Sequence, residues 1–394
     1  MKIINLPEAD ICIISPSLLE TGTNRGGGAE VTDYNVALQL SKRFRISILS
    51  PFHQKYRRSI RVNNNFSIIE VPFPAQKNYP NGSIAESYLN TILIYLYSFC
   101  SAFLTYKLAR NGLKVLIVHN PQTALPSIFI AKLLGIKLIY SEGNISPWIK
   151  PYIATPKSLL LRKYDSLNFY LTKIICKYSD RIRAQSISIR AGMIKSGVDY
   201  HKIRVISTGI DSNEFRPLYT KSAVGRIRIG FIGRLTEIKG APLLFDVVNA
   251  CVREIPNARF FIFGEGPYKS QLQAMPNIEH LGMVPRNELN QWLSQVDLVL
   301  FFQTELGRAE VEAMAAGKAV VACNLGEMPQ IITHLVDGFL CEPNSGSYVN
   351  AISYLSQNRD LIEELGKNAQ KMVTSHFNWE SVGIKWESLC KEII

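Results

Sequence analysis

Short apolar runs alternate with longer amphipathic segments along nearly the whole chain. Runs such as 11–15, 115–119 and 228–232 are flanked by polar, glycine or proline residues, which is typical of short buried strands. Between them lie segments such as 242–253, in which apolar positions recur every three or four residues and predict helices. Strands and helices that alternate in this way predict a parallel, doubly wound α/β sheet.

The alternation occurs twice, and this predicts two Rossmann-like domains that face each other across a cleft. The segment 205–218 is rich in turn residues and predicts the crossover between them. We therefore expect an N-terminal domain at 1–215, a second domain at 216–375, and a C-terminal helix within 376–394 that packs back towards the first domain. Ligands of such sheets bind at the carboxyl ends of the strands. The remaining predicted strands are 46–50, 66–71, 137–141, 182–184, 258–263, 278–281, 298–302, 319–323 and 338–341, with two helices after the last.

Composition fits this organisation. A chain of 394 residues suits about two domains. With 47% hydrophobic and 19% charged residues it can bury sizeable cores, which excludes a disordered protein. The seven cysteines are scattered without a C-x-x-C pair, so we expect reduced, mostly buried thiols of an intracellular protein. Glu8 and Asp10 precede the first apolar run and argue against a signal peptide.

The net charge of +12 is concentrated in the first half. Residues 1–215 contain 27 Lys and Arg against 13 Asp and Glu, whereas residues 216–394 contain 17 against 19. This asymmetry indicates an anionic partner of the first domain, and a generally solvated basic surface is the alternative. No DNA- or RNA-binding signature is present, so we expect no nucleic acid partner.

The segment 87–106 is nearly uncharged and about long enough to span a bilayer. It also contains Asn90, Ser98 and Ser101, and its apolar positions follow a helical rhythm. These features favour a helix buried in the first domain, or a helix face that lies on a membrane, over a transmembrane span.

The segment 301–323 carries the strongest signal of a site. Carboxylates near a packed core cost free energy unless they have a partner or a ligand, so Glu305 and Glu312 predict a site for a polar molecule. The loop 304–307 leads into a predicted helix at 308–316, and free backbone amides at a helix N-terminus suit a phosphate group.

A second pair of cationic residues flanks a predicted helix start. Gly233 and Arg234 follow the strand 228–232, and Lys239 precedes the next helix. An Arg and a Lys in this position suit a diphosphate, although two surface side chains beside a turn give the same pattern. The strand exit at 280–284 has backbone groups that could bind the edge of a nucleobase, or it is an ordinary strand end.

Two loops of the first half also carry polar groups. The glycine-rich segment 25–30 opens the first helix, but it is neither G-x-G-x-x-G nor a Walker motif, which disfavours dinucleotide and P-loop sites. Glu142 follows the strand 137–141 with Trp148 beyond it, and His119 ends the strand before. These groups could bind a hydroxylated acceptor, whereas His119 by itself suits a structural histidine.

Together the motifs resemble the retaining nucleotide-sugar glycosyltransferases of family 4, which have the GT-B fold. The resemblance is strongest between residues 203 and 337, through KIRVISTGIDSNEF, FIGRLTEIKG, FGEGP, LGMV and EAMAAGKAVVA, with GEMPQII and DGFL after them. GGGAE near the N-terminus and FNWESV near the C-terminus also resemble the family.

The resemblance implies a function and site residues. It implies transfer of a hexose-type sugar from a nucleoside-diphosphate sugar to a glycan, lipid-linked or other hydroxyl acceptor, with retention and without an essential metal or cofactor. Arg234 and Lys239 would neutralise the diphosphate and the leaving group. The other implied donor-binding residues are Glu312 at the ribose, Met283 and Val284 near the base, Gly233, the backbone of Leu306, Gly307 and Arg308, and Gly27 and Gly28 on the first-domain side.

The chain departs from the family pattern at two positions. The family carries a Glu eight residues before the Glu of EAMA, which is Thr304 here, whereas Glu305 is seven before Glu312. We expect Glu305 to reach the donor sugar in its place. The family's usual histidine is Glu142 here, which would replace it or bind an acceptor hydroxyl.

The positive charge of the first domain also indicates which acceptor it binds and where in the cell the enzyme is located. An anionic or lipid-linked glycan, bound by a cytoplasmic enzyme at the inner, anionic surface of a membrane, would explain the basic first half. Two alternatives remain open at this point. They are a nucleotide-sugar epimerase and a catalytically impaired GT-B binding protein.

Overall fold

The computed structural model describes residues 6–17, 21, 28–52, 59–74, 84–143, 148, 159–211, 213–218 and 226–394. It divides into two units, the first reaching Gly209 and including the returning segment Trp379–Ile394, the second being Ile210–Asn378. The boundary between the units lies before the domain boundary at 215/216 that the sequence predicted, because Phe215 is buried in the core of the second unit. Gly209 belongs to the first, where a Cβ atom would overlap the ring of Trp379.

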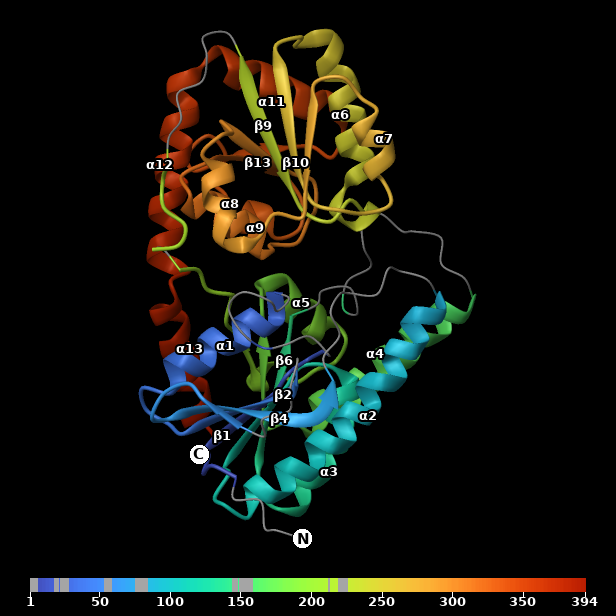
Figure 1. Ribbon diagram of the computed structural model, residues 1–394, viewed down its shortest axis with the longest axis vertical. Helices are drawn as coiled ribbons and strands as arrows, with labels where there is room; N and C mark the ends of the chain where they lie inside the picture. Colours follow the sequence, from blue (N-terminus) through green and yellow to red (C-terminus); the bar gives the residue numbers. More distant parts are fainter. Residues whose placement is uncertain are drawn as a thin grey trace. The chain divides into compact units, whose positions relative to one another are not determined.

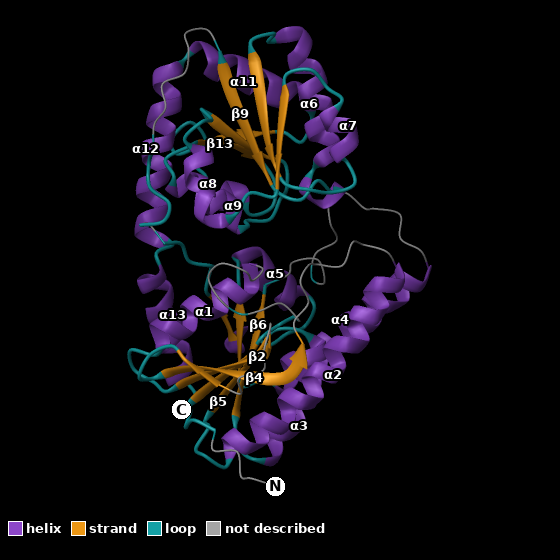
Figure 2. Ribbon diagram, viewed as in Figure 1, coloured by secondary structure: helices purple, strands orange, loops and turns teal. Residues whose placement is uncertain are grey.

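The first unit is built on an eight-stranded sheet in the order β3-β4-β2-β1-β5-β6-β7-β8 (Figures 1 and 2). All neighbours are parallel except β3, which runs antiparallel to β4 at one edge. The strands are β1 (Ile11–Ile14), β2 (Ile46–Phe52), β3 (Ser59–Arg61), β4 (Phe66–Pro74), β5 (Val115–Val118), β6 (Lys137–Glu142), β7 (Arg181–Ala184) and β8 (Ile203–Val205).

Helices cover both faces of this sheet because its central strands are apolar on both sides. In β1, Cys12 and Ile14 pack with the helices α2 to α5, whereas Ile11 and Ile13 pack with α1 and α13. The returning segment is α13, and its Trp386 is buried against the first sheet. The helices are α1 (Gly28–Leu40), α2 (Ile84–Ala109), α3 (Pro121–Leu133), α4 (Leu159–Tyr178), α5 (Ile187–Lys195), the 3-10 turn η1 (Tyr200–Lys202) and α13 (Trp379–Lys391).

The second unit has a six-stranded, fully parallel sheet in the order β11-β10-β9-β12-β13-β14. The chain winds outwards from β9 in one direction and then from β12 in the other, which is the strand order of the Rossmann fold. The strands are β9 (Ile227–Ile232), β10 (Ala258–Phe263), β11 (Ile278–Gly282), β12 (Leu298–Phe301), β13 (Ala319–Cys323) and β14 (Phe339–Cys341).

Two hydrophobic clusters lie on opposite faces of the second sheet. Phe231 and Leu300 pack with α6, α11 and the start of α12, whereas Phe301 and Val320 pack with α8, α9 and the end of α12. The helices are the 3-10 turn η2 (Glu237–Lys239), α6 (Ala241–Glu254), α7 (Lys269–Gln273), α8 (Arg286–Leu293), α9 (Arg308–Ala315), α10 (Met328–Ile331), α11 (Ser345–Gln357) and α12 (Arg359–His376).

The two predicted doubly wound sheets are confirmed, with corrections at their margins. The strands β3 and β8 were not predicted, because they are three residues each and lack a buried apolar run. Three helices, not two, follow β14, because Asn358 leaves the helical region with φ −119° and ψ 67° and separates α11 from α12.

Candidate functional site

The change of winding direction in the second sheet lies between β9 and β12, which are hydrogen-bonded neighbours. The loops that follow two such strands leave the sheet in opposite directions and open a crevice at its carboxyl edge. The loop after β9 contains Gly233, Arg234 and Lys239, and the loop after β12 contains Thr304 to Gly307. The topology therefore brings the two sequence motifs to one edge.

The loop after β9 presents two cations at this edge. The side chain of Arg234 is exposed and that of Lys239 is half-buried, and neither forms an ion pair with another described residue. Gly240 ends the turn η2 with φ +76°, in the left-handed region, and a Cβ atom there would overlap the Phe302 side chain. A glycine is therefore needed at position 240, where the chain turns from η2 into α6 against Phe302, just beyond β12.

The loop after β12 is fixed by a buried carboxylate at the start of α9. Oε2 of Glu310 accepts a hydrogen bond from the Gly307 amide at 3.0 Å, and its Oε1 accepts one from the Gln303 side chain. Gln303 also donates to the carbonyl of Glu305 at 3.1 Å. Complete burial raises the pKa of Glu310 to about 7. These hydrogen bonds fix the loop at the Glu305 carbonyl and at the Gly307 amide.

A second carboxylate reaches the same loop from the next strand. Glu327 follows β13, and its Oε2 accepts a hydrogen bond from the Leu306 amide at 2.9 Å. Its own amide donates to the Thr304 carbonyl at 2.8 Å. Partial burial raises the pKa of Glu305; the positive charge of Lys239 opposes this rise and the negative charge of Glu327 adds to it. Glu305, Glu327 and Lys239 thus influence one another electrostatically.

Glu312 lies one turn into α9 and is held by two arginines. Its Oε1 is 2.8 Å from Nη1 of Arg286 and 3.1 Å from Nη2 of Arg308. Arg286 in turn contacts Glu214 at 3.0 Å. Burial raises the pKa of Glu312, and the contact with Arg286 opposes the rise. Within the described chain no hydrogen bond reaches Oε2 of Glu312, so this oxygen is available to a ligand.

The strand exit after β11 carries the exposed side chain of Met283, with 82% of its surface accessible, and the half-buried Val284. His280 on the same strand contacts the Gly264 carbonyl at 2.8 Å and so joins this exit to the loop after β10. Gly264 has φ +150°, and a Cβ atom there would overlap the Gly233 carbonyl. The loops after β9, β10 and β11 are therefore close-packed at one edge.

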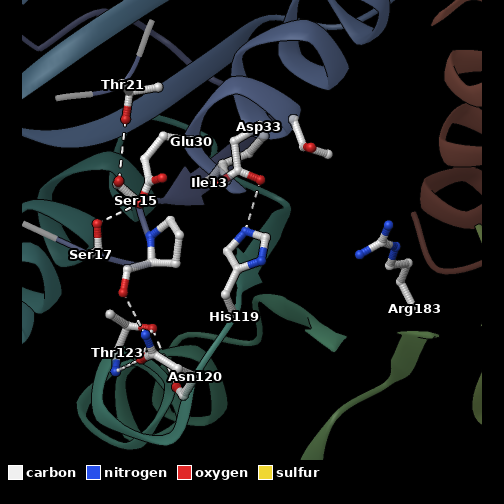
Figure 3. Close-up of polar contacts among 12 residues, drawn as sticks. Ile13, Ser15, Ser17, Thr21, Glu30, Asp33, His119, Asn120, Thr123 and Arg183 are labelled. Atoms are coloured by element: carbon white, nitrogen blue, oxygen red, sulfur yellow. Dashed lines mark hydrogen bonds and ion pairs between the residues drawn. The ribbon is translucent and has the colours of Figure 1, made fainter. Parts of the chain in front are cut away.

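Polar side chains also gather at the carboxyl edge of the first sheet, where its winding reverses between β1 and β5 (Figure 3). Glu30, on the first turn of α1, accepts a hydrogen bond from Ser17 in the loop after β1. Asp33, one turn further along α1, lies 3.0 Å from Nε2 of His119 at the end of β5. The two atoms are close but are not aligned as a hydrogen bond, and Nε2 has no hydrogen-bond partner among the described residues.

Some buried side chains near this edge have a polar atom without a hydrogen-bond partner among the described residues. These atoms include Oε2 of Glu30, Oδ2 of Asp33, Oγ of Ser141 and Nη2 of Arg183. Arg183, at the end of β7, donates to the Ile206 carbonyl at 2.6 Å, and burial lowers its pKa to about 10. Unpaired buried polar atoms are costly, so this edge is suited to a polar ligand or to water.

Glu142 ends β6 and is buried in the first unit. Its Oε2 accepts hydrogen bonds from the hydroxyl of Tyr140 and from the indole of Trp148, both at 3.0 Å. The second residue of the glycine pair, Gly28, begins α1, and its carbonyl accepts a hydrogen bond from Thr32 at 2.8 Å. Gly27 lies outside the described residues.

The predicted residues of the second unit are therefore brought to one edge of its sheet, but part of their environment was not foreseen. Two of the three expected backbone donors, the amides of Leu306 and Gly307, already donate to carboxylates. Arg286, Glu310 and Glu327 were not predicted as site residues. Glu327 could have been found from its position just beyond the buried strand 319–323, where side chains meet those of the neighbouring loop.

Family models match both parts of the chain. Residues 26–214 match the model described as Glycosyltransferase Family 4, and residues 226–358 match Glycosyl transferases group 1.

Curated relatives are distant and longer. The chain is 25% identical to a phosphatidylinositol N-acetylglucosaminyltransferase subunit from Arabidopsis thaliana over 70% of this chain and 61% of the relative. It is 28% identical to the sulfoquinovosyl transferase SQD2 of the same plant, over 66% of this chain and 52% of the relative. The chain thus spans between about half and three fifths of the length of these relatives.

Solved structures share the fold over nearly the whole chain. A sucrose-phosphate synthase of Thermosynechococcus elongatus aligns with a TM-score of 0.75 at 16% identity, covering 97% of this chain and 98% of that one. HepE of Anabaena, solved in complex with UDP-glucose, aligns with a TM-score of 0.69 at 17% identity, covering 98% and 100%. These similarities confirm the predicted fold of two Rossmann-like α/β units.

Proposed function

This chain belongs to the group 1 glycosyltransferases of family 4, and we propose that it transfers a hexose-type sugar from a nucleoside-diphosphate sugar to a hydroxyl acceptor, with retention of configuration. The observation that carries the proposal is that the loop with Arg234 and Lys239 and the loop with Glu305 follow two neighbouring strands, at the point where the second sheet changes its winding direction, and that the charge of Lys239 acts on Glu305. The structural neighbour HepE is solved with UDP-glucose, which supports a donor of this class.

In this proposal the two cations of the loop after β9 bind the diphosphate. Arg234 can bind phosphate oxygens bidentately and Lys239 supplies a point charge, so together they stabilise the negative charge that grows on the leaving group. We propose that these side chains make an essential metal unnecessary. Activity that persists in EDTA would support this, and restoration by added Mg²⁺ or Mn²⁺ would contradict it.

The remaining donor contacts follow from the positions of the side chains. We assign the ribose to Oε2 of Glu312, whose Oε1 is held by two arginines. The base lies towards Met283 and Val284, at the exit of β11. Glu305 contacts hydroxyl groups of the transferred sugar, because it shares the electrostatic environment of Lys239. The leaving phosphate then helps to deprotonate the acceptor on the same face of the sugar.

We assign the acceptor to the first unit. The buried groups at the edge of its sheet, Glu30, Asp33 and Arg183, keep unpaired polar atoms within the described chain, which suits the hydroxyl groups of a glycan. Glu142, at the end of β6, lies near this edge and is a further residue that we assign to binding of the acceptor substrate. The excess of basic residues in 1–215 favours an anionic or lipid-linked acceptor, and seven free cysteines favour a cytoplasmic location.

Thermal stabilisation by nucleotides tests the donor site. A ligand that binds only the native state raises its apparent stability. We expect one series of nucleoside diphosphates and their sugars to stabilise the wild type, and Arg234→Ala with Lys239→Ala to abolish the effect. Arg253→Ala with Lys371→Ala, which removes an exposed Arg and Lys outside the site, is the matched control and should keep it.

The products identify the reaction. Release of nucleoside diphosphate together with a glycosylated acceptor of unchanged anomeric configuration, read by proton NMR, would support the proposal. A new sugar nucleotide formed without acceptor would identify an epimerase. Stabilisation by no nucleotide, or equal loss in the control, would overturn the assignment of the donor site.

A further inference from the structure

One face of the helix α2 exposes a continuous stripe of large apolar side chains. The stripe consists of Ile92, Leu96, Phe99, Phe103 and Tyr106, of which Phe99 is 64% and Phe103 57% accessible. Steps of four and three residues keep these positions on one side of a helix. Solvent exposure of such a stripe is unfavourable, so it marks an interaction surface.

The opposite face of α2 is fixed in the core of the first unit. Tyr97, Leu104 and Leu108 are buried, and the Tyr97 hydroxyl donates to the Leu49 carbonyl at 2.7 Å. The part Ile92–Ala109 is long and apolar enough to cross a membrane, yet 39% of it is buried within the unit. Crossing a bilayer would require α2 to leave this core, so the helix is suited to lie along a surface.

The apolar surface continues onto the two neighbouring helices. α3 packs against both α2 and α4, and the three helices belong to one side of the first sheet (Figure 1). Phe129 is 70% accessible on α3, and Tyr170 is 63% accessible on α4. We call this surface the α2–α4 face. Its large exposed side chains are Ile92, Leu96, Phe99, Phe103, Tyr106, Phe129, Leu133, Leu167, Tyr170 and Tyr178.

The helices that form the α2–α4 face carry an excess of basic residues. Together α2, α3 and α4 contain six Lys and Arg and two Asp and Glu. Lys107 lies 4.6 Å from the ring centre of Phe103, and Lys177 lies 5.9 Å from that of Tyr178. Neither of these lysines has a carboxylate partner among the described residues. Exposed aromatic rings bordered by unpaired cations are typical of surfaces that bind an anionic interface.

We propose that the α2–α4 face binds the surface of an anionic lipid bilayer, with its aromatic side chains at the level of the headgroups and its lysines on lipid phosphates. A second copy of the chain is a poorer occupant, because two such faces would bring like charges together. The inference is independent of the proposed donor site, since binding to a bilayer requires no nucleotide.

Flotation with lipid vesicles tests this surface on the full chain. Vesicles of phosphatidylcholine mixed with phosphatidylglycerol should bind the protein, and pure phosphatidylcholine vesicles should bind it more weakly. Phe99→Ser with Phe103→Ser should lower the affinity for anionic vesicles at least about tenfold, because two large apolar groups no longer enter the interface. Lys107→Glu should lower it several-fold and reduce its dependence on salt.

The control replaces two apolar side chains that are exposed elsewhere. Ile384→Ser with Tyr354→Ser changes residues of α13 and α11 and should leave vesicle binding unchanged. The circular dichroism spectrum and the thermal unfolding midpoint without ligand, measured on each variant, confirm that it is folded. Absence of binding to anionic vesicles would overturn the proposal, as would equal loss in the control. A dimer that dissociates in the Phe99 and Phe103 variant would also overturn it, in favour of a second copy.

Discussion

The Leu306 amide donates a hydrogen bond to Oε2 of Glu327 at 2.9 Å, across 21 positions of sequence. The bond joins the loops after β12 and β13, which lie together because these strands are parallel neighbours. The Gly307 amide likewise donates to Glu310. Two backbone amides that could otherwise donate to a phosphate group therefore already donate to carboxylates of the chain itself. We therefore expect binding of a diphosphate to depend on the side-chain cations of the loop after β9.

We expect Glu327 to support catalysis through its hydrogen bond to the loop after β12. Glu327→Ala leaves the Leu306 amide without its acceptor, which costs about 1–3 kcal/mol, so kcat/KM should fall by about tenfold to a hundredfold. Glu327→Gln keeps an acceptor oxygen and should stay within about threefold of wild type. Steady-state kinetics measures both, with the exposed Glu363→Ala as the control. Equal losses in the Ala and Gln variants would show that the charge matters instead.

Glu305 should recognise the sugar and not the nucleotide. Glu305→Ala should lower kcat/KM for the sugar nucleotide at least about tenfold, because a hydrogen bond from a sugar hydroxyl to a charged group is lost. Calorimetry should show an unchanged Kd for the nucleoside diphosphate alone. Adding Thr304→Glu, which restores a carboxylate eight residues before Glu312, should recover part of the activity. Weaker binding of the diphosphate itself would contradict the assignment.

The sequence predicted those parts of the site that depend on local spacing. Arg234 follows a strand with a clear apolar pattern, and Glu312 lies in the helix that follows the next such strand of this edge, so their place at the carboxyl edge could be inferred. Arg286 and Glu327 contact the site across long stretches of chain, and no periodicity in a single sequence reports such contacts. The short edge strand β3 was missed for a related reason, because its residues are exposed or half-buried and lack an apolar signal.

Glu312 should discriminate ribose from deoxyribose. Its Oε1 is held by Arg286 and Arg308, which leaves Oε2 to accept hydrogen bonds from ribose hydroxyls. Wild type should bind the ribonucleoside diphosphate about tenfold more tightly than its 2′-deoxy form. Glu312→Gln should reduce this ratio towards one in calorimetry. A ratio that is unchanged in the variant would place the ribose elsewhere, whatever the loss in overall affinity.

Glu310 should make stability depend on pH. Burial raises its pKa from 4.5 to about 7 in the folded state, so the folded protein keeps a proton that the unfolded chain releases. The stability that Glu310 contributes is therefore greatest below pH 4.5 and declines as the pH rises to about 7. Glu310→Gln removes this titration. The free energy of unfolding of Glu310→Gln minus that of wild type should therefore increase by roughly 3 kcal/mol as the pH rises from 4.5 to about 7.

Urea denaturation of both proteins, from about pH 4.5 to about pH 8, measures this difference directly. Taking the difference at each pH cancels the titration of all other groups. Glu363→Gln, at an exposed position of α12, is the control and should give a curve parallel to that of wild type. A parallel curve for Glu310→Gln would instead mean that Glu310 titrates alike in the folded and unfolded states, so that its burial is offset by the amide of Gly307 and the charge of Lys239.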